Sequence, residues 1–215
     1  MIKHKTVFQG GCGTYVEKKS KFIAHVQDVE SVEEAQEYIE AVKKRFWDAR
    51  HNCFAFRVGS DQVITRCSDD GEPAGTAGRP ILDVILANDI YNIVIVVTRY
   101  FGGTLLGTGG LIRSYTEAAK RGIEDSEIIE KIPGRRYIAE MEYTDLGKLR
   151  YLLEKNHYLI EDTEYTDRVL LRLLVPEEEK GAFEKIVSDG CGGRVALRSQ
   201  DPVYYGEIDH EVIVF

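Results

Sequence analysis

One stretch, residues 90–125, limits the fold more than any other part of the 215-residue chain. It begins with IYNIVIVVTRYF (90–101), an apolar and β-branched run that indicates a central, buried strand. Residues 102–110, GGTLLGTGG, contain five glycines. The next run, GGLIRSYTEAAKRGIED (109–125), has the apolar spacing of a helix. A buried strand, a glycine loop and a helix in direct succession require a sheet with helices packed on it.

The glycine loop has two interpretations, and both stay open at the level of sequence. Backbone N–H groups that converge at a helix N-terminus bind phosphates, with Arg99 and Arg113 close enough to help. Alternatively, the glycines supply left-handed turns and close packing of helix against strand. The spacing matches neither a P-loop nor the GxGxxG pattern. Candidate residues for binding an anion, an RNA or a partner are Arg99, Tyr100, Gly102, Gly103, Gly107, Gly109, Gly110 and Arg113.

The remaining helices and strands of the first half are predicted from the spacing of apolar residues and from residues that are typical of helix and strand ends. We expect a strand at 20–29, a helix at 32–46, a hairpin of HNCFAFRVG (51–59) with QVITRCS (62–68), and a helix through ILDVILAND (81–89). Ser31 is the predicted N-cap of the first helix, with Glu34 completing a capping box. Thr76 is the predicted cap of the second. Residues 68–80 form a polar loop rich in Gly and Pro.

A break in the pattern at Pro133-Gly134 predicts two domains, residues 1–132 and 133–215. The second half contains strand YIAEMEY (137–143), helix DLGKLRYLLEKN (145–156), strands LIEDTEY (159–165) and RVLLRLLV (168–175), helix PEEEKGAFEKIVSDG (176–190), and strands RVALRSQDPVYY (194–205) and HEVIVF (210–215). Strand-helix-strand-strand-helix-strand is the ferredoxin-like order. Pro176 and Gly190 fit the two ends of the last helix. The expected fold class is therefore α+β, in two domains.

A second group of polar residues surrounds the loop 68–80. Arg50, His51 and Arg79 join the candidate binding residues, and Asp69, Asp70 and Glu72 form a possible acidic site. Such carboxylates could bind a divalent cation, but an acidic Gly-Pro loop is more often a solvated turn, so we predict no metal and no cofactor. Cys53 and Cys67 have the surroundings of small buried hydrophobes, and no nucleophile, base and acid assemble. A binding protein is favoured over an enzyme.

Charge and composition restrict the partners. The net charge is −8, with 16 basic and 19 acidic residues up to residue 130 and 12 and 17 after it. A contact with RNA must therefore be a local patch, and no sequence-specific DNA binding is expected. The segment MIKHKTVFQGG lacks a signal-peptide core, and no apolar run approaches the roughly 20 residues of a membrane span. We expect a cytoplasmic protein with reduced cysteines and no membrane partner.

Five blocks are similar to the Impact (YigZ) family. They are SKFIAHV, DARHNCFAFRVG, SDDGEPAGTAGRPIL, VIVVTRYFGGTLLGTGGLIRSY and EAAK. The resemblance is dense over residues 5–130 and weaker beyond. It implies a first domain like that of a ribosomal protein and of elongation factor G domain IV, and a second domain like domain V of that factor. Eukaryotic members restrain activation of a translation-factor kinase and carry an RWD domain that this chain lacks. Binding of RNA or the ribosome is the usual proposal for bacterial members.

Three functions remain open. A translation-linked binding module predicts salt-sensitive association with ribosomes or RNA through a positive strip that includes Arg99 and Arg113. An enzyme for a small phosphorylated substrate, using loop 102–110 and residues 69–72, predicts a concave pocket between loops 68–80 and 99–110. A protein-interaction module predicts a large apolar patch without basic residues.

Overall fold

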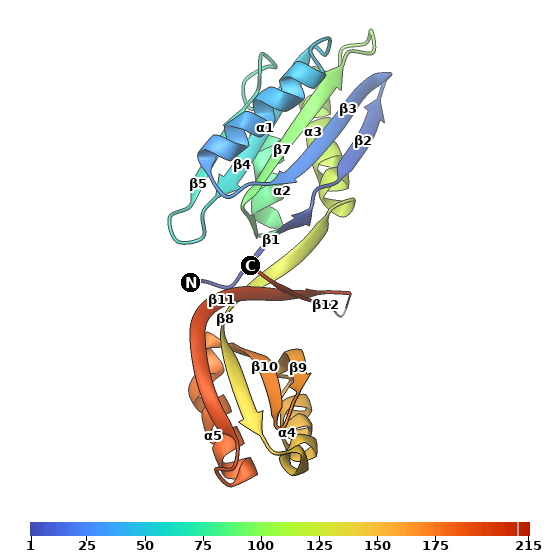
Figure 1. Cartoon of the computed structure of the whole chain (residues 1–215). Helices are drawn as coiled ribbons and strands as arrows, with labels where there is room; N and C mark the ends of the chain where they lie inside the picture. The colour runs from blue at the N-terminus through green and yellow to red at the C-terminus, as the bar shows by residue number, and fades with distance from the viewer. Residues whose placement is uncertain (210) are drawn as a thin grey trace. The chain divides into compact units, whose positions relative to one another are not determined.

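The computed structural model describes residues 1–209 and 211–215 and divides them into two compact units (Figure 1). The first unit holds Lys3–Ile129 with Met1, and the second holds Glu130–Phe215 with Ile2. Strand β8 (Glu127–Met141) begins in the first unit and continues into the second. Pro133 and Gly134, where the sequence predicts a break between domains, lie inside this strand, and the two units divide between Ile129 and Glu130. Gly134 is needed there because a Cβ would come within 2.3 Å of the Tyr205 ring.

A five-stranded antiparallel sheet organises the first unit. Its order is β2-β3-β7-β4-β5, with β2 at Cys12–Glu17, β3 at Ser20–Asp28, β4 at His51–Val58, β5 at Ile64–Ser68 and β7 at Ile93–Tyr100. Beside it, β1 (His4–Gln9) pairs in parallel with β6 (Ile90–Tyr91). The apolar run of the sequence thus becomes the central strand, as predicted.

Helices cover both faces of this sheet, which explains why β7 shows no polar alternation. Ile93, Ile95 and Val97 belong to a core shared with α2 (Gly78–Ala87) and α3 (Gly107–Glu124). Val94 and Val96 face the opposite way, into a smaller core with α1 (Val32–Arg45). One strand therefore separates two cores.

The helix ends confirm one capping prediction and correct another. The Ser31 hydroxyl accepts a hydrogen bond from the Glu34 N–H at 3.1 Å, as expected for the N-cap of α1. The Glu34 carboxylate, however, accepts from the N–H of Glu30 and not from that of Ser31. Thr76 does not cap α2, because its hydroxyl donates to the Pro73 carbonyl at 2.7 Å.

The second unit is ferredoxin-like, as predicted. Its strands β8, β9 (Leu159–Tyr165), β10 (Val169–Pro176) and β11 (Ala196–Ile208) lie in the order β9-β10-β8-β11, and all pairs are antiparallel. Helix α4 (Tyr143–Lys155) and helix α5 (Lys180–Cys191), which follows a short 3₁₀ turn at Glu177–Glu179, share one core with this sheet. Strand β12 (Glu211–Val214) extends the sheet beside β11, and residue 210 of the predicted last strand lies outside the described residues.

The end of α5 differs from the sequence-based expectation. The helix passes through Gly190 and ends at Gly192, which has the left-handed φ of 59°. Gly190 has a different role, because a Cβ there would come within 2.4 Å of the Leu152 side chain on α4. The glycine therefore permits close packing of the two helices.

Candidate functional site

A cavity of about 340 Å³ lies in the first unit, between the loop after β5 and the start of α3. This is the place where the sequence predicts a concave pocket for the enzyme hypothesis. The residues that line it are Arg50, His51, Gly71, Glu72, Pro73, Arg99, Phe101, Leu105, Leu106, Gly107, Thr108 and Leu111. Four of them were candidate binding residues (Arg50, His51, Arg99 and Gly107), and Glu72 belonged to the candidate acidic site.

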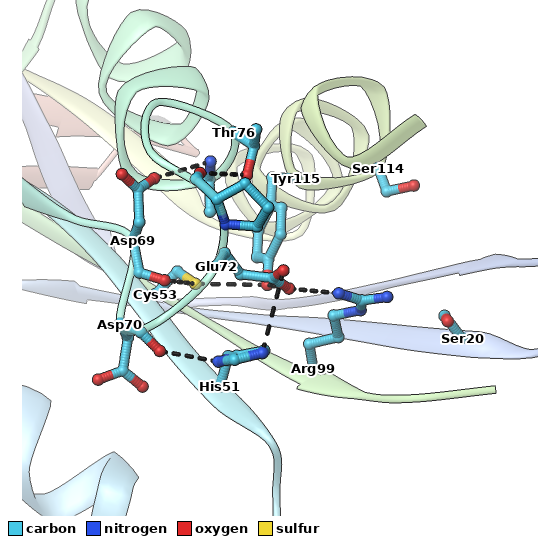
Figure 2. Close-up of polar contacts among 12 residues, drawn as sticks. Ser20, His51, Cys53, Asp69, Asp70, Glu72, Thr76, Arg99, Ser114 and Tyr115 are labelled. Carbon is cyan, nitrogen blue, oxygen red and sulfur yellow. Dashed lines mark hydrogen bonds and ion pairs between the residues drawn. The ribbon is translucent and has the colours of Figure 1, made fainter. Parts of the chain in front are cut away.

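A buried ion pair, drawn in Figure 2, belongs to the lining of this cavity. Arg99, near the end of β7, donates from Nη1 to Oε1 of Glu72, and the two side chains are only 6% and 3% exposed. The Tyr115 hydroxyl on α3 donates to the same oxygen at 2.8 Å. Buried charges persist when they are paired and hydrogen-bonded in this way. Arg99 therefore does not belong to an exposed positive strip.

His51 is held at the edge of this pair. Its Nδ1 lies 2.8 Å from the carbonyl oxygen of Asp70, and because a carbonyl only accepts, Nδ1 carries the hydrogen. Its Nε2 faces Oε2 of Glu72 at 3.9 Å (Figure 2). The start of β4 and the loop after β5 thus fix both the position and the tautomer of the imidazole.

Cys53 lies behind the ion pair and is buried. Its Sγ is 3.0 Å from the Asp69 carbonyl oxygen and 3.3 Å from the Tyr115 hydroxyl. Burial raises the pKa of the Cys53 thiol far above its ordinary value, and the nearby carboxylates raise it further. Burial likewise raises the pKa of Tyr115. Both groups stay protonated and act as hydrogen-bonding members of the core.

The three carboxylates of the loop do not converge, which corrects the expectation of an acidic site. Asp69 points toward α2, where its carboxylate accepts from the N–H groups of Gly75, Ala77 and Gly78 at 2.8–3.0 Å. Asp70 accepts from the Asn52 N–H at 2.7 Å. Only Glu72 reaches the cavity. Within residues 1–209 and 211–215, no cluster of three or more His, Cys, Asp or Glu is arranged to hold a metal.

The glycines of the loop have different structural roles. Gly102 is required for packing, because a Cβ there would come within 2.0 Å of the Lys19 carbonyl carbon. Gly103 and Gly107 have positive φ values of 84° and 67°, which favour glycine. Among the described residues, a Cβ at Gly109 would meet no atom within 4 Å, and a Cβ at Gly110 would lie 3.1 Å from Leu106 Cβ. Helix α3 begins here without a side-chain cap and without an acidic residue in its first turn.

The remaining candidates lie outside the cavity. Arg79 pairs with Asp83 on α2 at 2.8 Å, and Arg113 is exposed on α3. The Tyr100 hydroxyl donates to Asp48 at 3.0 Å. Sequence reasoning missed the apolar lining, above all Leu105, which is 84% exposed. The signal was a pair of leucines inside a loop of glycine and threonine.

The fold and the site define a two-domain α+β protein with an open, part-charged cavity on its first domain. Residues 18–123 match the model of the Impact N-terminal domain, and residues 140–194 match a domain of unknown function, DUF1949. The IMPACT family member YvyE of Bacillus subtilis is 36% identical over 93% of this chain and 92% of its own length. IMPACT family member YigZ of Escherichia coli is 36% identical over 84% of this chain and 89% of its own. The chain belongs to the IMPACT family, which confirms the resemblance.

A solved structure supports the fold assignment. The crystal structure of a hypothetical protein is 33% identical to this chain, covers 94% of it and 98% of its own length, and has a TM-score of 0.58. Among the described residues, no helix has the length and apolar character needed to cross a membrane.

Proposed function

We propose that this chain is a non-enzymatic cytoplasmic protein that binds the ribosome or structured RNA and thereby modulates translation. The observation that carries the proposal is a group of exposed basic and apolar side chains on three loops of the first unit. We call it the loop-end surface, and it consists of Lys18, Lys19, Trp47, Arg50, Phe101 and Leu105.

Contacts between the three loops support treating these residues as one surface. The Gly102 N–H donates to the Ser20 hydroxyl at 3.1 Å, which ties the glycine loop to the turn that holds Lys18 and Lys19. The Arg50 N–H donates to the Arg99 carbonyl at 3.1 Å, and the Arg50 guanidinium lies 5.3 Å from the centre of the Phe101 ring.

The chemistry of the loop-end surface suits RNA. Trp47 is 83% exposed and Phe101 39% exposed, and unpaired bases stack on aromatic rings of this kind. Lys18, Lys19 and Arg50 are exposed and suited to phosphate contacts. A net charge of −8 repels RNA elsewhere on the molecule, so such a local surface would also determine the orientation of binding.

The proposed role in translation is based on the family to which the chain belongs. The chain belongs to the IMPACT family, and the resemblance implies a role in translation control for its eukaryotic members. It also implies a domain order like that of domains IV and V of elongation factor G, which act on the ribosome. This link to the ribosome is an analogy between folds.

A protein partner is the second candidate, since Trp47 and Leu105 are exposed apolar side chains. A protein-interaction surface predicts an apolar patch without basic residues. Here three basic side chains lie on the same loops, and this favours RNA over protein.

Sedimentation of cell lysate on sucrose gradients tests the proposal, with the full-length chain and matched pairs of variants. Lys19→Glu and Trp47→Ala each weaken association with ribosomes about 10-fold, because one reverses a phosphate contact and the other removes a stacking ring. Lys120→Glu is the charge control, since it lies about 20 Å along α3 from the first residue of that helix, Gly107. Tyr151→Ala, an exposed residue of the second unit, is the aromatic control.

The two controls keep wild-type sedimentation. Nuclease treatment releases the wild-type chain if RNA is the contact. A wild-type chain that stays in the free fraction at low and high salt, or equal loss with Lys19→Glu and Lys120→Glu, contradicts the proposal.

A further inference from the structure

We infer that the cavity of the first unit binds a small molecule that has an oxyanion head group, phosphate or carboxylate, on an apolar body. This inference does not depend on the proposed function, because it rests on Arg99, Gly107 and Thr108, which do not belong to the loop-end surface. Arg50, Phe101 and Leu105, which are half of that surface, also line the cavity.

The helix α3 supplies one end of the site. It has 18 residues, and Gly107 and Thr108 of its first turn line the cavity. The first N–H groups of a helix have no partner within the helix, and its N-terminus has a partial positive charge. Among the residues that the structure describes, no side chain caps this end and no acidic residue lies in the first turn, so an oxyanion in the cavity would satisfy these donors.

Arg99 places a second cation at the site, and its Nη1 is paired with Glu72. Its side chain is only 6% exposed, it lines the cavity, and its Nε has no hydrogen-bond partner among the residues that the structure describes. A buried donor without a partner is costly. Arg50 and Arg99 bring two positive charges to the cavity and Glu72 brings one negative charge, so the lining keeps a net positive charge that an anion would neutralise.

The rest of the lining indicates the body of the ligand. Pro73, Phe101, Leu105, Leu106 and Leu111 line the cavity, and about 340 Å³ is near the lower end of the range for small-molecule sites. A compact apolar group attached to the head group fits this lining.

The test uses Thr108→Asp with Thr108→Asn as its matched control. A carboxylate in the first turn is favourable for a helix, so Thr108→Asp is expected to fold and to melt no lower than the wild type. Its negative charge takes the place of the head group and repels a bound anion. Asparagine has nearly the same shape without the charge.

Inorganic phosphate and phenyl phosphate are the probes, titrated into the full-length chain by calorimetry and by amide NMR of Gly107, Gly109 and Gly110. The wild type binds both saturably, and phenyl phosphate binds about 10-fold more tightly because its ring enters the apolar lining. Thr108→Asp weakens both by at least about 10-fold, and Thr108→Asn changes them by less than about 3-fold.

Three results overturn the inference. The first is a wild-type chain that shows no saturable binding of phenyl phosphate. The second is equal affinity in Thr108→Asp and Thr108→Asn. The third is single-stranded RNA that displaces phenyl phosphate from the wild type and is itself weakened by Thr108→Asp, because the oxyanion would then be the RNA backbone. If the wild-type chain binds phenyl phosphate but does not sediment with ribosomes, only the proposed function is rejected.

Discussion

At the scale of single residues, Asp69 organises the loop between β5 and α2. Its carboxylate accepts hydrogen bonds from three backbone N–H groups, those of Gly75, Ala77 and Gly78. The N-cap residue of α2 is Ala77, whose side chain cannot accept a hydrogen bond, so Asp69 caps the helix instead. Burial alone would raise the pKa of Asp69, but these three donors outweigh it and lower the pKa below the ordinary value of 3.8. The charged form is therefore the one that stabilises the fold.

Asp69→Asn tests this role through pH. At neutral pH we expect the variant to lose about 1–2 kcal/mol, because an amide oxygen is a weaker acceptor than a carboxylate. Since the folded pKa lies below 3.8, the contribution of the charge is complete above that pH and is lost as the pH falls through the folded value. Urea unfolding at several pH values should show the gap between wild type and variant closing below pH 3.8. Asp61→Asn, on an exposed loop, should show no gap.

The same loop shows why the site could be predicted only in part. Asp69, Asp70 and Glu72 are neighbours in the sequence, and proximity suggested one acidic site. Asp70 has a positive φ of 43°, as has Gly71 at 88°, and these turns send the three carboxylates in different directions. The partners of Glu72, Arg99 and Tyr115, are 27 and 43 residues away, so no local pattern could identify the buried cluster.

At the scale of elements, the glycine loop joins β7 to α3 by glycines with different roles. Gly102 packs against the backbone at Lys19, whereas Gly109 lies in the first turns of α3 with open space around its Cβ position. The sequence showed a cluster of glycines after a strand and hence a loop. It could not separate the roles, because they depend on a turn about 80 residues earlier in the chain.

Gly102→Ala and Gly109→Ala should shift stability in opposite directions. The first places a methyl group 2.0 Å from a backbone carbon, and we expect a loss of about 2–4 kcal/mol. The second meets no atom within 4 Å and replaces a poor helix former, with an expected gain of up to about 1 kcal/mol. Midpoints of urea unfolding measure both. A stable Gly102→Ala chain would mean that the loop and the β2–β3 turn are not in close contact.

At the scale of the whole molecule, the order of elements was sufficient to predict the two-domain α+β fold. Uninterrupted apolar residues marked β7 as central, and strand-helix alternation marked the ferredoxin-like unit. The exact join was not predictable in this way, since Pro133 and Gly134 are typical of turns and yet lie within β8. Gly134 is present because Tyr205, which is 71 residues further along the chain, packs against it.

Net charge leads to a prediction about salt. The chain has a charge of −8, so RNA can approach only at a local basic surface. If Lys18, Lys19 and Arg50 provide the phosphate contacts, the logarithm of the binding constant for single-stranded RNA falls with the logarithm of salt concentration with a slope of about −2. Fluorescence anisotropy across a salt series measures it. A slope near zero would exclude phosphate contacts by these side chains.

The position of β7 between two cores has a consequence for how the sequence can diverge. Ile95 packs with α2 and α3, whereas its neighbour Val96 packs with α1. Suppose that one of these side chains becomes smaller by a methylene and its neighbour becomes larger by one. The composition of the strand is then almost unchanged, but one core has a void and the other is overpacked. Compensating changes must therefore come from across the same core. In an alignment of relatives, covariation along β7 is expected to repeat every second residue, with odd positions following α2 and α3 and even positions following α1.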